Sequence, residues 1–270
     1  MTPDAIAAVE ASLVSTRFLG ASTRVAPALA VSLAKVETSL HTEWQRAMLA
    51  LPGGDAVQTF AAWHGVTSCG GYRKAAGWHG KGLAVDVQYR RQGYLVTRTR
   101  TARGVVYGGE AAASSIPRAR EAFAAACDRA CMALDGAPAD LSARKPGETG
   151  GAVWDRFDRV SRAVVAYLAP YYPSVDDFDA GDDDVLPGVT IPAQVSADYH
   201  ALRVPLVVGS PVPDPRLTRN PARGMLAWRR PVFVALDAAG FRLGLCDFGA
   251  RESGDSHHVD LASRIASGAV

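Results

Sequence analysis

Residues 78–87 have the sequence WHGKGLAVDV, in which a histidine and an aspartate enclose a short glycine-containing run. Seven extended residues would separate His79 from Asp86 by roughly 23 Å, whereas two ligands of one zinc ion each lie about 2 Å from the metal. Gly80 and Gly82 can reverse the chain, because glycine adopts the positive-φ conformations that a tight turn needs. The segment therefore predicts a turn followed by a short strand, which brings His79 close to Asp86.

The predicted strand runs from Leu83 to Val87. Leu83, Val85 and Val87 share one face and Ala84 and Asp86 share the other, because side chains alternate along a strand. A carboxylate beside an alanine has a small neighbour and room for an ion. A hairpin with an incidental surface histidine and aspartate fits the same residues, so the local pattern leaves both interpretations open.

His79, Gly82, Ala84 and Asp86 form the pattern His-x-x-Gly-x-Ala-x-Asp. This pattern resembles the first zinc motif of the LAS group, the metallopeptidases related to D-alanyl-D-alanine carboxypeptidases and phage L-alanyl-D-glutamate endolysins. Residues 67–73, TSCGGYR, are similar to the family's upstream Ser-x-x-Tyr-Arg element, with one extra residue. The two similarities together point to a zinc peptidase.

The family's second metal motif has an acidic residue three places before a histidine, in an H-F-E/D-L context. Residues 255–261, DSHHVDL, are similar to it. The resemblance thus covers about 63–107 and 228–261, and it implies His258 as the third metal ligand.

Periodicity does not choose between the two adjacent histidines of this motif. In a strand Asp255 and His257 share a face, whereas in a helical turn Asp255 and His258 do. The resemblance selects His258 and leaves His257 as a nearby donor. The sequence departs from the family at Asp255, where many members have the longer Glu, and at Gly77, where a serine often stands.

The resemblance implies a zinc-dependent peptidase that hydrolyses peptidoglycan peptide bonds involving D-amino acids, as a carboxypeptidase or an endopeptidase. Two histidines and one carboxylate leave a fourth position of Zn2+ open for water, whose pKa zinc lowers toward about 7. Asp255 would accept the proton of that water. Arg73 would hold the substrate carboxylate or stabilise the oxyanion, and Tyr72, Trp78 and His257 would line the substrate cleft.

Two alternatives to this peptidase remain open. The first is a non-catalytic cell-wall-binding or structural module of a phage or injection particle that retains the fold. The second is another metal-dependent hydrolase that uses the same ligands. A phage or secretion particle is accordingly a candidate partner, beside the peptidoglycan peptide itself.

The whole sequence predicts an α+β fold in a single domain of residues 1–270. A small antiparallel sheet carries the zinc site, flanked by N-terminal helices within 1–56 and by a largely helical insertion at about 110–225 between the two zinc-motif segments. Apolar spacing predicts helices over 3–14, 22–51, 116–134 and 153–168, and strands near 83–87, 231–236 and 241–248.

Charge and hydropathy exclude several classes of protein. The chain has 270 residues and a formal net charge of +2, so nucleic-acid binding is not favoured. The arginines between 90 and 103 alternate with other residues as on an exposed strand. The sequence contains no run of about 18 or more apolar residues, so it does not predict a transmembrane helix.

The N-terminus lacks the basic start and apolar stretch of a secretory signal. We therefore expect the protein to stay in the cytoplasm until lysis or a dedicated export system delivers it to the cell wall. The four cysteines are too few for a disulfide scaffold. Cys69 and Cys246 each lie near a zinc-motif segment, so a bridge between them is an open hypothesis.

Overall fold

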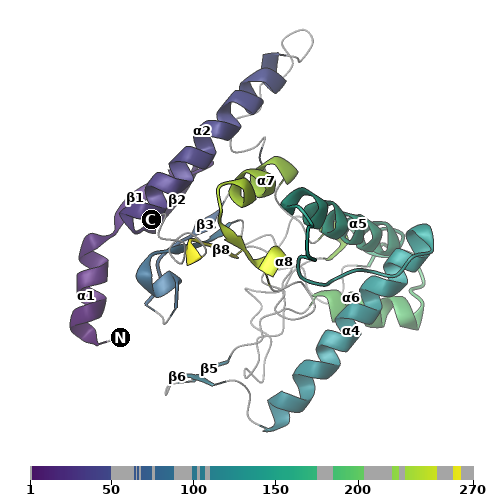
Figure 1. Cartoon of the computed structure of the whole chain (residues 1–270). Helices are drawn as coiled ribbons and strands as arrows, with labels where there is room; N and C mark the ends of the chain where they lie inside the picture. Colours follow the sequence, from purple (N-terminus) through teal and green to yellow (C-terminus); the bar gives the residue numbers. More distant parts are fainter. Residues whose placement is uncertain are drawn as a thin grey trace. The chain divides into compact units, whose positions relative to one another are not determined.

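The computed structural model has an α+β fold, as the sequence predicts, with helices and small antiparallel sheets (Figure 1). Within the part of the chain that the structure describes, no helix combines the length and the apolar character needed to cross a membrane. The described residues are 2–49, 64, 66, 68–74, 77–87, 99–101, 104–106, 110–174, 185–203, 221–224, 229–247 and 258–262.

The chain forms two compact units. Unit 1 contains Met1–Arg90, Ala227–Gly244 and His257–Val270, and unit 2 contains Arg91–Leu226 and Leu245–Ser256. Both segments that resemble zinc motifs contribute described residues to unit 1. The organisation as one domain with an insertion at about 110–225 stays a prediction.

The N-terminal part of unit 1 contains two helices, α1 (Pro3–Ser12) and α2 (Pro27–Leu49), and between them the hairpin of β1 (Val14–Phe18) and β2 (Ala21–Val25). The prediction of helix from residue 22 onward was therefore wrong for β2. The alternating burial along β2 is typical of a strand. Leu19 and Gly20, the two residues of the hairpin turn between β1 and β2, both have positive φ, as a two-residue hairpin turn of this kind requires.

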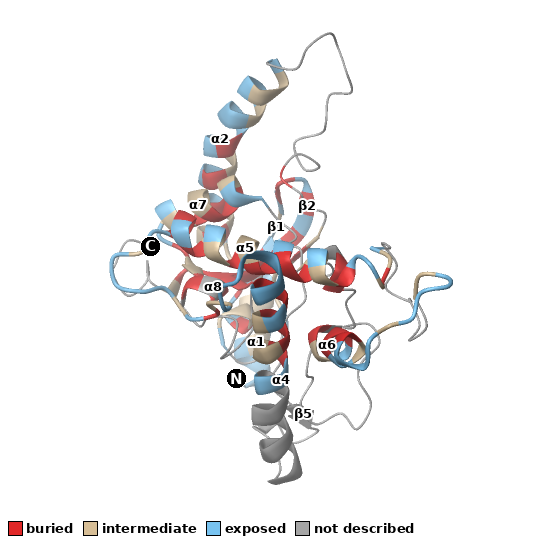
Figure 2. Cartoon of the chain, turned by 90° about the vertical axis from the view of Figure 1, so that its right-hand side faces the viewer, coloured by how far each residue is buried: buried red, intermediate tan, exposed pale blue. Residues whose placement is uncertain are grey.

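Helix α2 is buried only in part. Its buried residues all lie between Leu29 and Leu40, and the remainder, toward its C-terminal end, is exposed or half-buried (Figure 2). Because the buried positions recur every three to four residues, one stripe of the helix faces the interior of unit 1. The helix contacts β1 and α7 (Arg230–Ala238).

Four short antiparallel strands of unit 1 form the sheet that carries the candidate site. Their order is β3 (Cys69–Gly70), β4 (Ala84–Val87), β8 (His258–Asp260) and β7 (Arg242–Leu243). One face of this sheet is apolar, because the side chains on it are almost completely buried hydrophobic groups: Cys69, Val85, Val87, Leu243 and Val259.

Two predicted strands near the C-terminus were wrong in whole or in part. Residues 231–236 lie in helix α7, which has Pro231 at its start and Val232, Phe233 and Leu236 on its buried side. A short apolar run does not distinguish a strand from a buried helix. Of the predicted strand 241–248, the structure describes residues 241–247, and among these only the two residues of β7 are assigned to a strand, with α8 (Gly244–Asp247) after them.

Unit 2 contains the strands β5 (Thr99–Thr101) and β6 (Gly104–Val106), the helices α4 (Glu110–Asp135), α5 (Gly150–Leu168) and α6 (Ala193–Arg203), and the 3-10 helix η4 (Pro221–Arg223). The helices predicted over 116–134 and 153–168 are confirmed within α4 and α5. Helix α6 was missed, because its amphipathic pattern is short.

A buried carboxylate links helices α4, α5 and α6 of unit 2. Asp198 of α6 accepts hydrogen bonds from Arg129 of α4 and from the Tyr167 hydroxyl of α5, at 2.9 Å each. Burial raises the pKa of Asp198, but the hydrogen bonds from Arg129, Tyr167 and Gln194 outweigh it, so the pKa is lowered. The acid is thereby kept ionised and paired inside the helical unit.

Candidate metal centre

The candidate centre occupies the polar face of the four-stranded sheet. Gly70, Asp86 and His258 lie opposite one another on β3, β4 and β8. Residues that are paired across antiparallel strands point to the same face, with Cβ atoms about 5 Å apart. The sheet register alone therefore brings Asp86 and His258 together, and Gly70 contributes no side chain that would fill the space beside Asp86.

The neighbouring row of the same face consists of Ala84, Asp260 and Arg242, on β4, β8 and β7. These residues lie two places along the strands from the first row, so they share its face. Ala84 gives the Asp260 carboxylate a small neighbour. The alternation predicted for β4, with Ala84 and Asp86 on one face, is consistent with this register.

His79 reaches the site from the turn that precedes β4. The 3-10 helix η2 (His79–Lys81) ends at Gly82, whose φ of 69° is in the left-handed region. The amide of Leu83 donates to the Trp78 carbonyl at 2.9 Å, which closes the turn. The predicted reversal is confirmed, but Gly82 alone of the two proposed glycines has a positive φ, since Gly80 lies within the 3-10 helix.

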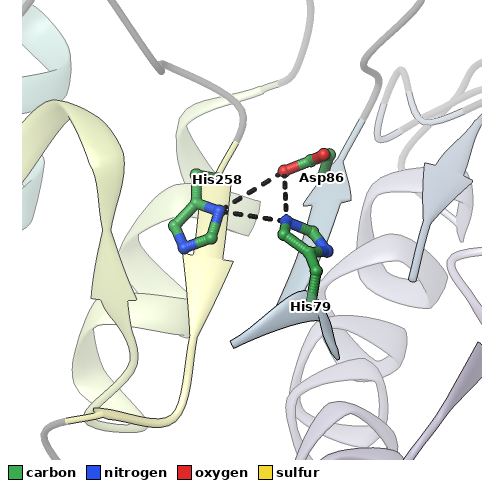
Figure 3. A group of neighbouring side chains, drawn as sticks. All are labelled: His79, Asp86 and His258. Atoms are coloured by element: carbon green, nitrogen blue, oxygen red, sulfur yellow. Dashed lines mark hydrogen bonds and ion pairs between the residues drawn. The ribbon is translucent and has the colours of Figure 1, made fainter. Parts of the chain in front are cut away.

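Three side chains converge at this point: His79, Asp86 and His258 (Figure 3). His79 Nε2 lies 3.0 Å from Asp86 Oδ1 and 3.3 Å from His258 Nδ1, and His258 Nδ1 lies 3.4 Å from Asp86 Oδ1. Ligand atoms about 2.0–2.1 Å from a tetrahedral metal are about 3.3 Å apart. The three atoms thus have the spacing of three ligands on one ion.

The second ring nitrogen of each histidine lies within hydrogen-bond distance of an acceptor oxygen. His79 Nδ1 lies 2.8 Å from the Gly71 carbonyl, and His258 Nε2 lies 2.9 Å from Asp260 Oδ2. Donation of N–H to these acceptors leaves the lone pairs of His79 Nε2 and His258 Nδ1 facing the Asp86 carboxylate. Such an arrangement is repulsive without a cation, so the donor set fits a bound metal ion.

The convergent side chains are shielded from solvent but not sealed. Asp86 is 3% exposed, His258 11% and His79 14%. Low exposure strengthens the attraction between the carboxylate and a cation, because less water screens it. The two histidines are the more accessible members of the group.

Arg73 lies at the same centre. Its guanidinium forms an ion pair with Asp86 through Oδ2, while Asp86 Oδ1 faces the two histidines. The Arg73 side chain is about half exposed. Arg73 is therefore close enough to act on a group bound at the site, although its predicted role in holding a substrate carboxylate stays a prediction.

The structure describes two of the other predicted site residues, Trp78 and Tyr72. Trp78 is half-buried beside His79, and the ammonium of Lys81 lies 5.1 Å from its ring centroid. The Tyr72 hydroxyl is buried and has no hydrogen-bond partner among the described residues. Asp255 and His257 lie outside the described residues, so the predicted base and the predicted extra donor stay predictions.

Two residues of the polar face, Asp260 and Arg242, were not among the predicted site residues. Asp260 stands two places after His258, and this spacing on a strand was a signal that the two share a face. Arg242 had no comparable signal, since only the pairing of β7 with β8 places it beside Asp260.

The hypothesis of a bridge between Cys69 and Cys246 is not supported, because both cysteines are buried and neither forms a disulfide. Burial raises the pKa of Cys69 to about 12, although a hydrogen bond with Thr23 opposes this effect.

No family model, curated protein or solved structure matches this chain.

Proposed function

We propose that this protein is a zinc-dependent peptidase that hydrolyses peptide bonds of the bacterial cell wall involving D-amino acids. The observation that carries the proposal is the convergence of His79 Nε2, Asp86 Oδ1 and His258 Nδ1 within 3.0–3.4 Å of one another. Two imidazoles and one carboxylate, with a fourth position open, are the ligand set of many catalytic zinc sites. The resemblance to the LAS motifs supplies the substrate class.

When bound, zinc polarises a carbonyl oxygen and makes water more acidic. Asp86 would hold the ion through Oδ1, the oxygen that faces the histidines, while its Oδ2 forms the ion pair with Arg73. The half-exposed guanidinium of Arg73 can attract a substrate carboxylate, for which its planar pair of donors is suited. Asp255, three residues before His258, is the proposed base that takes up a proton and returns it to the leaving amine.

Digestion of purified muropeptides tests the proposal. The wild type should release products with zinc and none with a chelator, and Asp255→Ala should lose turnover but retain zinc. Asp4→Ala, which removes an exposed carboxylate in the first turn of α1, is a matched control and should cleave as the wild type does.

Absence of zinc-dependent cleavage by the wild type would refute the proposal. Stoichiometric zinc together with bound but intact peptides would instead identify a non-catalytic cell-wall-binding module.

A further inference from the structure

Asp260 is a buried carboxylate beside the candidate metal group. It contacts the opposite side of the His258 ring from the candidate ligands and is not one of the three. It lies on β8 two residues after His258, and its Oδ2 is 2.9 Å from His258 Nε2. The opposite nitrogen of the same ring, Nδ1, faces Asp86 and His79. Asp260 thus contacts the side of His258 that points away from the metal position.

Asp260 is itself held from two sides. Arg242, its cross-strand neighbour on β7, donates from Nε at 3.0 Å and from Nη2 at 2.5 Å to Oδ2. The amide of Ala262 donates to Oδ1 at 2.8 Å. The side chain is completely buried. A carboxylate with this many donors has little freedom to rotate, so its position relative to His258 is fixed.

The hydrogen bonds of Asp260 also fix the position of the His258 proton. The oxygens of Asp260 accept hydrogen bonds from Arg242 and from the Ala262 amide, as those of a carboxylate do. A carboxylate can only accept a hydrogen bond, so His258 carries its proton on Nε2, which faces Asp260. The lone pair of Nδ1 is left free to bind a cation.

We propose that Asp260, clamped by Arg242, is a positioning residue that fixes His258 as an Nδ1 metal ligand. Acceptors of this kind orient a metal-binding imidazole and increase its basicity, and their loss typically weakens metal affinity about 10- to 100-fold. The inference rests on the metal centre of the proposed function, but not on peptide hydrolysis.

Zinc affinity of the full-length protein, measured by competition with a chromophoric chelator, tests the inference. Asp260→Asn preserves the shape of the side chain but removes its charge and should weaken zinc binding about 10- to 100-fold. Arg242→Met leaves Asp260 in contact with His258 but releases the clamp, so a smaller loss is expected. Circular dichroism shows whether each variant is folded.

Asp198→Asn is the matched control. Asp198 is also a buried carboxylate that is paired with an arginine, but it belongs to unit 2 and is not one of the candidate ligands. It should lose stability and keep wild-type zinc affinity. A general loss of packing would weaken zinc binding in both aspartate variants, whereas a positioning role affects Asp260→Asn alone.

The protonation of His258 gives a second measurement. Nitrogen-15 NMR of the metal-free wild type should show a proton on Nε2 of His258, and Asp260→Asn should lose this preference. A proton on Nδ1 in the wild type would overturn the inference. If Asp260→Asn does not fold, the zinc affinity of Arg242→Met decides the question, because a wild-type affinity in that folded variant would overturn the positioning role.

The outcomes separate this inference from the proposed function. Zinc binding by folded Asp260→Asn and Arg242→Met at wild-type affinity would overturn the positioning role and leave the peptidase proposal intact. Weakened zinc binding without any muropeptide cleavage by the wild type would support the positioning role and refute the peptidase. A wild type that binds no zinc would overturn both.

Discussion

Substitution of Gly82 by alanine tests the turn on which the whole centre depends. An added Cβ would lie 2.5 Å from Leu13 Cδ2 and 2.8 Å from the backbone nitrogen of Ala26. The end of Leu13 can rotate away, but the Ala26 nitrogen is fixed by its hydrogen bond to the Gly82 carbonyl at 2.9 Å. The turn that presents His79 would therefore have to move.

Two costs combine in Gly82→Ala. The left-handed conformation costs a residue with a Cβ about 1–2 kcal/mol, and overpacking typically adds about 1–3 kcal/mol. We expect a loss of about 2–5 kcal/mol in the stability of unit 1, together with weaker zinc binding, because His79 begins the same turn.

Gly77→Ala is the matched control for this substitution. Gly77 has a φ of 90°, but an added Cβ would meet nothing within 4 Å, so only the conformational cost of about 1–2 kcal/mol applies. Hydrogen exchange at the amides of β4, measured by mass spectrometry in a urea series, reports the opening free energy of unit 1 in each variant. Equal losses in Gly82→Ala and Gly77→Ala would refute the close packing around Gly82.

Three further predictions concern the ligands, a titrating acid and the thiols. Alanine at any one of the three candidate ligands should abolish stoichiometric zinc binding in metal analysis, whereas His200→Ala, on the exposed surface of α6, should not. Burial raises the pKa of Asp140, but hydrogen bonds from Lys145 and Ser142 lower it to about 2. Because the folded pKa lies below the unfolded one, its stabilisation is present above about pH 4 and is lost as the pH falls toward 2. Unfolding curves at several pH values measure the difference in stability between the wild type and Asp140→Asn. This difference should shrink as the pH falls over that range, and a constant difference would contradict the prediction. All four cysteines are buried and none forms a disulfide. A thiol reagent should therefore react slowly with the native protein and titrate four thiols in denaturant without a reductant, and fewer than four would indicate a disulfide.

Local sequence features predicted the parts of the molecule whose structure depends on near neighbours. Gly82 before an alternating run predicted the turn and the face that Asp86 shares with Ala84, and apolar spacing predicted most of α4 and α5. Prediction from local features failed where one sequence pattern fits two structures. The apolar residues 231–236 fit a buried strand as well as helix α7, and residues 22–25 were assigned to the adjacent helix rather than to β2.

The sequence by itself determined which residue types are available as ligands, and it placed His79 and Asp86 together because seven residues and one left-handed glycine define that distance. The resemblance to the second zinc motif predicted His258 as the partner of this pair, but only the tertiary structure brings His258 to it. His258 is 179 residues away from His79, and it arrives through backbone pairing of β8 with β4, in which no side chain identifies the neighbouring strand. The pairing of β7 with β8 in turn places Arg242 beside Asp260, which also contacts His258. Backbone hydrogen bonds are nearly alike for every residue, so the register that assembles this centre is set by the burial of the opposite, apolar face of the sheet.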